Sequence, residues 1–155
     1  MDYVELTTTN GIKFLVDRAD CSTLVQYRWF ATKEHNSNNF VIRAFKSKRI
    51  TLHRFITNAP KGMVVDHINH NTLDNRRSNL RVCTQKQNSW NSHKKSNHTN
   101  PYKGVHRSSM GRWKAVIREA GKYKHIGVYD TPEEAAIAYD RKAIELFGEY
   151  ACKNF

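Results

Sequence analysis

The stretch Val65–Asn88, VDHINHNTLDNRRSNLRVCTQKQN, decides what fold and what chemistry this chain is expected to have. It opens with a carboxylate beside an imidazole, Asp66 and His67, and continues through a run of amides flanked by arginines. Few of these side chains favour burial, so no amphipathic pattern explains the run. It is therefore either an unusually polar loop or a site for polar chemistry on a polyanion.

Short regular elements are expected on both sides of this loop. The residues just before Asp66 are typical of a short buried strand, and residues 80–83 alternate apolar and polar as a second strand would. Thr84, with a glutamine three residues later, forms a capping box that predicts a helix over about 85–93. We therefore expect a ββα unit over about 62–93, in which the strand end and the first helical turn face each other.

Ahead of this unit the sequence predicts short antiparallel strands. Asn10-Gly11 between two alternating runs is a strong hairpin signal. Residues 50–56 fit either a strand end or a short helix. The expected strands are YVELTT (3–8), IKFLVD (12–17), YRWFAT (27–32) and FVIRAF (40–45).

A second, smaller unit is expected after a linker. Residues 96–101 lack periodicity and predict that linker, which separates a unit at 1–95 from one at 102–155. Residues 112–119 alternate as a strand and residues 123–129 make a further strand. On the first of these strands one face holds Arg112, Lys114, Val116 and Arg118, and the other holds Trp113, Ala115 and Ile117.

The last helix has the clearest boundaries in the chain. Thr131 is the expected N-cap, Pro132 lies at the first helical position, Glu134 completes a capping box and Gly148 ends the helix. Its apolar stripe is expected to pack on a three-stranded sheet whose outer face is basic; the stripe consists of Ala136, Tyr139, Ala143 and Phe147. The fold class is therefore α+β.

Charge favours a nucleic-acid partner. The formal net charge is +12, and residues 43–95 hold 12 basic and 2 acidic residues. Such an excess suits phosphate neutralisation, although a solvated basic surface is the alternative. No apolar run reaches the roughly 20 residues of a membrane span, and the first residues do not form a signal peptide. Three cysteines without CxxC spacing argue against a disulfide framework or structural zinc, so an intracellular setting is expected.

Three residues in and beyond the polar loop suit phosphodiester hydrolysis. A hard divalent cation takes oxygen ligands and keeps several waters, so the carboxylate of Asp66 and the amide oxygen of Asn88 can hold it. His67 can take a proton from water at neutral pH. Adjacent residues on a strand point to opposite faces, so Asp66 and His67 can act together only if the strand ends or bends there.

The run from Val65 to Asn88 resembles the HNH endonuclease family, in the homing-endonuclease-like branch of phages and mobile elements whose motif is His-Asn-Asn. The resemblance implies a ββα-metal nuclease unit with His67 as general base, and Asp66 and Asn88 as ligands of one divalent ion, Mg²⁺ or alternatively Mn²⁺. It also implies that Asn79 ties the loop through side-chain to backbone hydrogen bonds. The segment LHR at 52–54 resembles a part of this branch expected to support the fold or contact phosphate.

Other residues near the loop can have either a structural or a functional role. Arg76 and Arg77 are expected to neutralise phosphate rather than merely solvate the loop. His70 is expected to be an exposed loop residue, Trp90 a packing residue and His53 a structural one. Further DNA contacts are expected from Arg54, Arg81 and Lys86.

Residues 101–155 resemble the ethylene-response-factor (Apetala-type) DNA-binding domain of plants, through YKGV, GRWKAVI, IGVYDTPEEAAIAYD and the final NF. Met110, His125 and Ser108 depart from the usual tryptophans and arginine of that family, and Lys124 occupies an apolar position. We therefore expect weaker base reading, through backbone and shape. The resemblance implies DNA contacts by Lys103, His106, Arg112, Lys114, Arg118, Tyr123 and His125.

The function that combines these features is a metal-dependent DNA endonuclease that nicks or cuts duplex DNA as a monomer or weak dimer, without a small-molecule cofactor or membrane partner. The alternatives are a DNA-binding regulator with an inactive nuclease scaffold, and an RNA-binding protein. The first 45 residues are expected to pack beside the catalytic unit, and additional DNA contacts are assigned to Arg43, Lys46, Lys48 and Arg49.

Overall fold

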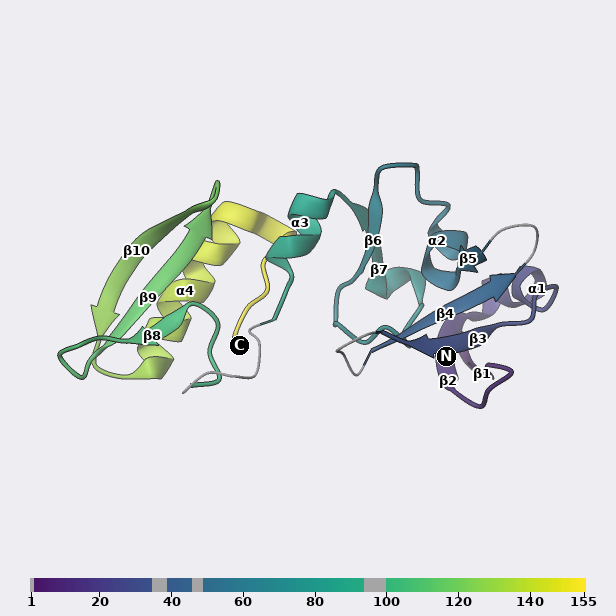
Figure 1. The fold of residues 1–155 in the computed structure, drawn as a ribbon, viewed down its shortest axis with the longest axis horizontal. Helices are drawn as coiled ribbons and strands as arrows, with labels where there is room; N and C mark the ends of the chain where they lie inside the picture. The colour runs from purple at the N-terminus through teal and green to yellow at the C-terminus, as the bar shows by residue number, and fades with distance from the viewer. Residues whose placement is uncertain (1, 35–38, 46–48, 94–99) are drawn as a thin grey trace. The chain divides into compact units, whose positions relative to one another are not determined.

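The computed structural model divides the chain into two compact units, residues 1–85 and 86–155 (Figure 1). The boundary lies ahead of the expected linker at 96–101, most of which falls outside the described residues. None of the described helices is long and apolar enough to cross a membrane. The α+β class is confirmed, with four small antiparallel sheets among the described residues. Those residues are 2–34, 39–45, 49–93 and 100–155.

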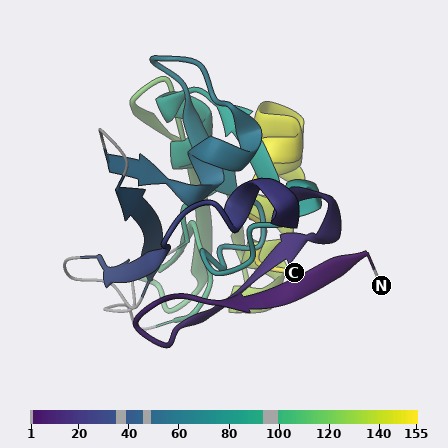
Figure 2. The same ribbon diagram turned by 90° about the vertical axis from the view of Figure 1, so that its right-hand side faces the viewer.

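The first unit begins with a hairpin of strands β1 (Tyr3–Thr7) and β2 (Lys13–Asp17), drawn in purple in Figure 2. The turn contains the predicted Asn10-Gly11 pair, and Gly11 has a φ of 84°, a left-handed conformation that glycine adopts without steric cost. The hairpin prediction is confirmed.

A three-stranded antiparallel sheet follows, in the order β3 (Phe30–Lys33), β4 (Phe40–Phe45) and β5 (Arg49–Thr51). Strand β3 starts three residues later than predicted, because Trp29 turns inward and its indole Nε1 donates to the carbonyl oxygen of Leu24 at 2.9 Å. Leu24 ends the short helix α1 (Cys21–Leu24), which the sequence did not predict.

The elements around the polar loop come in the predicted order. Helix α2 (Leu52–Thr57) resolves the ambiguous segment after β5. Strand β6 (Val64–His67) pairs antiparallel with β7 (Leu80–Cys83), and β6 ends at His67 as the sequence argument required. Helix α3 (Gln85–Trp90) is shorter than expected. One apolar core supports the first unit and consists of Phe14, Val16, Leu24, Trp29, Ile42, Ala44, Leu52, Ile56 and Leu80.

The second unit is a three-stranded antiparallel sheet in the order β10 (Lys122–Tyr129), β9 (Trp113–Glu119) and β8 (Val105–Arg107), packed on helix α4 (Pro132–Phe147). Figure 1 shows α4 running along one face of this sheet. Thr131 and Glu134 make the predicted capping box. The predicted stripe is confirmed, since all four of its side chains are buried: Ala136, Tyr139, Ala143 and Phe147.

Two irregularities in the second unit explain departures from the expected pattern. Strand β10 bulges between His125 and Gly127, so Lys124 is exposed and pairs with Glu119. Most of α3 groups with this unit, because Trp90 stacks on Phe147 with ring centroids 4.7 Å apart. The expected packing role of Trp90 is confirmed.

Candidate functional site

A hydrogen-bonded scaffold holds the polar loop of the first unit. The buried side chain of Asn79 accepts from the backbone N–H of Asn69 at 2.9 Å and donates to the carbonyl of Asp74 at 2.7 Å. The amide of Asn69 also donates to the Asp74 carboxylate at 3.0 Å. These side-chain bonds replace the ladder bonds that an irregular loop lacks, so the chain after His67 has a defined course.

Asp66 lies at the end of β6 and is bound to Arg81, its direct partner across the strand pair. Nη2 and Nε of Arg81 lie 2.6 Å and 2.9 Å from the same carboxylate oxygen, Oδ2. The two side chains are only 8% and 10% exposed, so the pair is sheltered from solvent. The predicted metal ligand therefore already carries a cationic partner.

His67 is the last residue of β6 and is also buried. Its Nε2 lies 3.3 Å from Oδ1 of Asn75, and the Asn75 amide nitrogen in turn donates to the carbonyl of Thr72 at 3.1 Å. Because Oδ1 can only accept, Nε2 carries the proton and the lone pair of the neutral ring lies on Nδ1. Burial lowers the pKa of His67, which keeps the ring neutral at pH 7.

A second histidine packs against this ring. The His53 and His67 ring centroids lie 5.6 Å apart in an edge-to-face arrangement. Burial, and secondarily the neighbouring His67, lower the pKa of His53 to about 4. A neutral, half-buried imidazole on α2 agrees with the structural role expected of His53.

The third predicted site residue, Asn88, lies on α3 and is half-buried. Asp66 belongs to the first unit and Asn88 to the second. The closing of these two oxygens around one ion stays a prediction. His70 is half-buried with a φ of 62°, so it is not the exposed loop residue that was expected.

The arginines of the first unit are built into its structure. Arg54 donates to three carbonyls of the 59–63 turn, at 2.6 to 3.0 Å. Arg76 binds the Asp74 carboxylate through Nε and Nη2, and Arg77 binds Asp20 in the same way across 57 residues of sequence. A phosphate would have to share or displace these partners. Of the additional basic residues, Lys46 and Lys48 lie outside the described residues.

The exposed face of the C-terminal sheet brings five of the predicted DNA contacts together. Residues directly opposite each other in antiparallel strands share a face. His106 pairs with Lys114, and Tyr123 pairs with Arg118, whose guanidinium lies 5.7 Å from the tyrosine ring centroid. His125 pairs with Val116 on the same face, opposite to the buried Ala115 and Ile117.

The other predicted contacts of this unit lie elsewhere. Arg112 precedes β9 and forms an exposed ion pair with Asp130 at 2.8 Å. The ammonium of Lys103 donates to the carbonyls of Trp90 and Ser92 at 2.8 Å and 2.6 Å. Lys86 lies over the Trp90 ring. Lys103 and Lys86 thus line a hollow of the second unit, not its sheet face.

Sequence reasoning missed Asn75 and the pairing of Arg81 with Asp66. Asn75 was one amide among many in the loop, and no local signal distinguished it from its neighbours. The Arg81 pairing had a usable signal, because two strands of equal length joined by a loop place Asp66 opposite Arg81 once the register is known.

Comparison with known proteins identifies similarity to nucleases and to plant transcription factors. The family model described as HNH endonuclease matches residues 57–90, which include β6, β7 and α3. The chain is 36% identical over 135 residues to an uncharacterized HNH endonuclease of Acanthamoeba polyphaga mimivirus, covering 83% of this chain and 67% of that protein. It is 34% identical to protein 3.8 of Escherichia phage T7 over 93 residues, 59% of this chain and 76% of the relative. An ethylene-responsive transcription factor of Arabidopsis thaliana is 46% identical over 57 residues, 36% of this chain and 31% of the factor.

Proposed function

This chain belongs to the HNH endonuclease family, and on that premise we propose that it is a metal-dependent endonuclease that hydrolyses phosphodiester bonds of double-stranded DNA. The observation that carries the proposal is the arrangement at the end of β6. There a neutral imidazole, with its tautomer set by Asn75, follows directly on a sheltered carboxylate. A strongly basic chain supplies the attraction for the phosphates.

In this proposal His67 is the general base. A water molecule attacks the phosphorus atom and gives its proton to Nδ1 of His67 as the bond from phosphorus to the leaving oxygen of the strand breaks. Nε2–H remains bound to Oδ1 of Asn75 throughout. The imidazolium formed is stabilised by the nearby carboxylates of Asp66 and Asp74, both of which favour protonation of His67. Asn75 therefore acts as a positioning residue that keeps the lone pair on the nitrogen that needs it.

The donor set suits a hard cation. A carboxylate from Asp66 and an amide oxygen from Asn88 would hold Mg²⁺, or alternatively Mn²⁺, with the remaining positions filled by water and substrate oxygens. When bound, such an ion neutralises charge on the phosphoryl group and stabilises the leaving oxygen. For the ion to bind, Arg81 would have to share the Asp66 carboxylate or give up one of its two hydrogen bonds to it.

The C-terminal sheet would position the duplex. Its exposed face carries Lys114 and Arg118 for phosphates and two histidines and a tyrosine for further contacts. The partial similarity to ethylene-responsive factors supports DNA as the partner of this face. A single chain carries one proposed catalytic site, so it would nick one strand. A double-strand break would need a weak dimer or two successive events.

One observation favours a second candidate, a DNA-binding regulator whose nuclease unit serves as scaffold. The ion pair between Asp66 and Arg81 neutralises the carboxylate without any metal. A regulator would bind DNA and leave it intact at every metal concentration.

Nicking of supercoiled plasmid, titrated with Mg²⁺ and Mn²⁺ against an EDTA control, separates the two. The endonuclease predicts metal-dependent relaxed circles, and His67→Ala should abolish them while DNA binding in a mobility-shift assay stays within about twofold. Lys142→Gln, on α4 and paired with Glu145, is the control and should still nick. Cleavage by His67→Ala at the parental rate would exclude His67 as the base, and no cleavage by the parent would favour the regulator.

A further inference from the structure

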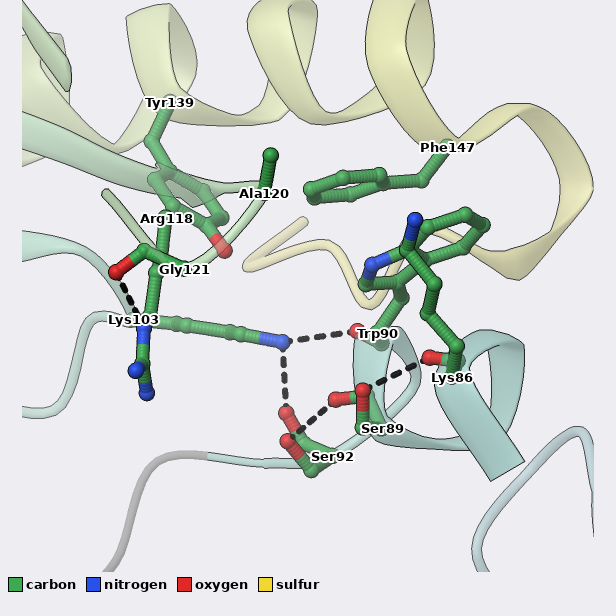
Figure 3. A pocket seen from close by; sticks show the side chains of 10 residues that line it. All are labelled: Lys86, Ser89, Trp90, Ser92, Lys103, Arg118, Ala120, Gly121, Tyr139 and Phe147. Carbon is green, nitrogen blue, oxygen red and sulfur yellow. Dashed lines mark hydrogen bonds between the residues drawn. The ribbon is translucent and has the colours of Figure 1, made fainter. Parts of the chain in front are cut away.

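The second unit contains a cavity that the proposed nuclease chemistry does not use. It has a volume of about 450 Å³ and lies between α3, the Lys103 segment, the β9–β10 turn and α4 (Figure 3). Ligand sites for small molecules typically measure about 300–1,000 Å³, so the cavity has the size of such a site.

Three cations line the cavity and no carboxylate does. They are Lys86, Lys103 and Arg118, and among the described residues none of them forms a salt bridge. Lys103 donates to two neutral carbonyls; burial lowers its pKa, and the nearby Cys152 and Asp140 only partly offset this effect. Glu119 lies near Lys86 but is bonded to Lys124. The positive charge of this lining therefore favours the binding of an anion in the cavity.

A hydroxyl in the cavity wall, unpartnered among the described residues, also points to a ligand. Tyr139 is 4% exposed, and Figure 3 shows its hydroxyl directed into the cavity. No described residue forms a hydrogen bond with that hydroxyl, so its proton is available to a ligand in the cavity. Burial strongly raises the pKa of Tyr139, so the group stays a neutral donor at every physiological pH.

One wall of the cavity is aromatic. The Trp90 and Phe147 rings stack at 4.7 Å with an interplanar angle of 17°. The ammonium of Lys86 lies 5.7 Å from the Trp90 ring centroid (Figure 3). Aromatic side chains bind nucleobases by stacking, which suits any base because every base has a π-face.

We propose that this cavity binds a nucleoside phosphate, with the phosphate held by Lys103 and Arg118, the base against the Trp90–Phe147 wall, and the Tyr139 hydroxyl donating to the ligand. The ligand is either a free nucleotide or the terminal nucleotide of a DNA strand. The proposal is independent of the catalytic role of His67, because every residue involved belongs to the second unit. A free phosphate would leave the aromatic wall unused, which is why a nucleoside phosphate fits better.

Calorimetric titration of the full chain in EDTA tests the proposal with four probes: deoxyadenosine monophosphate, deoxyadenosine, inorganic phosphate, and a short 5′-phosphorylated single strand. The nucleotide is expected to bind at least tenfold more tightly than nucleoside or phosphate. Tighter binding of the phosphorylated strand than of the free nucleotide identifies a strand end as the source, and the reverse order identifies a soluble ligand; both support the proposal. Equal binding of inorganic phosphate and nucleotide, or no binding of either nucleotide form, would overturn it.

Variants make the test specific. Tyr139→Phe removes only a hydroxyl without a partner among the described residues, so it should leave the melting temperature unchanged and weaken nucleotide binding about tenfold. Arg118→Gln should weaken binding by a similar factor, and Lys142→Gln, on α4 and paired with Glu145, should not. Parental affinity in both Tyr139→Phe and Arg118→Gln would refute the site. No metal or cleavage enters the measurement, so this result does not depend on the nuclease proposal.

Discussion

Arg81 and Asp66 form a sheltered ion pair in which two guanidinium nitrogens lie 2.6 Å and 2.9 Å from one carboxylate oxygen. The pair couples the proposed metal site to the stability of the β6–β7 strands, because each partner neutralises a charge that would otherwise be buried. A metal ion bound at Asp66 would neutralise part of the carboxylate charge that Arg81 neutralises when no metal is bound.

This coupling predicts that Arg81→Met destabilises the chain less when metal is present than when it is absent. Without metal, the variant should lose about 3–5 kcal/mol of unfolding free energy, because it leaves a buried carboxylate uncompensated. With saturating Mg²⁺, much of that loss should be recovered, so the metal-induced rise in melting temperature should be larger in the variant than in the parent. Differential scanning calorimetry in EDTA and in Mg²⁺ measures both.

Arg77→Met is the control for that experiment, since Arg77 pairs with Asp20, and its side chain is 57% exposed. It should cost far less stability and leave the response to Mg²⁺ unchanged. An equal response to Mg²⁺ in Arg81→Met and in the parent would show that the ion and Arg81 do not compete for the Asp66 carboxylate.

The elements that local chemistry specifies were predictable. The start of α4 is indicated by Thr131, Pro132 and Glu134, because capping involves only residues within one turn. The first hairpin is indicated by Asn10-Gly11, because a tight turn also depends only on its own residues. The bulge after His125 was signalled only indirectly, by a lysine at an apolar position.

The contacts that join distant segments were not predictable. Arg77 reaches Asp20 across 57 residues, and nothing near either residue indicates its partner. The role of Asn79 in tying the loop was predicted only through family resemblance, because polar loops have no periodicity to interpret. The contact between Asn75 and His67, which sets the tautomer of the histidine, is evident only in the folded chain.

The lowered pKa of His53 predicts that the free energy of unfolding falls in mild acid. Burial lowers its pKa from 6.5 to about 4, so the folded state binds a proton less readily than the unfolded chain. The contribution of neutral His53 to the free energy of unfolding is therefore fully present above pH 6.5. It is lost progressively as the pH falls toward 4, by up to about 3 kcal/mol. Denaturant unfolding of the parent and of His53→Gln, measured between pH 7.5 and 4, isolates this contribution.

The difference in unfolding free energy between parent and His53→Gln should shrink or change sign in favour of the variant as the pH falls through that window. A difference that stays constant with pH would mean that His53 titrates normally in the folded chain.

Asn79→Ala should destabilise the loop scaffold. The buried amide makes bonds to Asn69 and Asp74, and its removal leaves a backbone N–H and a carbonyl without these partners. We expect a loss of about 2–3 kcal/mol and a parallel loss of nicking activity, measured by chemical denaturation and plasmid assay. Asn71→Ala, at an exposed position of the same loop, should cost less than half as much. Equal losses would indicate that Asn79 is no more than one loop residue among others.

Gly104→Ala should unfold the second unit selectively. Gly104 has a φ of 73°, and a Cβ there would lie 2.0 Å from the Tyr139 ring and 2.7 Å from the carbonyl oxygen of Val116. Backbone strain and steric overlap together should cost more than about 3 kcal/mol. Gly121→Ala is the control, because Gly121 has a similar φ of 82° with open space around it and should cost only about 1 kcal/mol.

Hydrogen exchange read separately for the two units provides the measurement. Amides of β8, β9 and α4 should lose protection in Gly104→Ala, while those of β1 and β2 keep theirs. Loss of protection throughout the chain would show that the two units unfold as one.

Lys114→Gln tests whether the exposed sheet face meets the DNA backbone. Lys114 lies opposite His106 on that face, with Arg118 four residues further along the same strand. If its ammonium neutralises one phosphate, the variant should bind duplex DNA several-fold more weakly at low salt, and the slope of log K against log salt should fall by about 0.9. Lys142→Gln removes the same charge from α4, where it pairs with Glu145, and should leave the slope unchanged. Because both variants change the net charge equally, a drop in slope that is the same for both would assign the attraction to overall charge and remove the sheet face from the DNA interface.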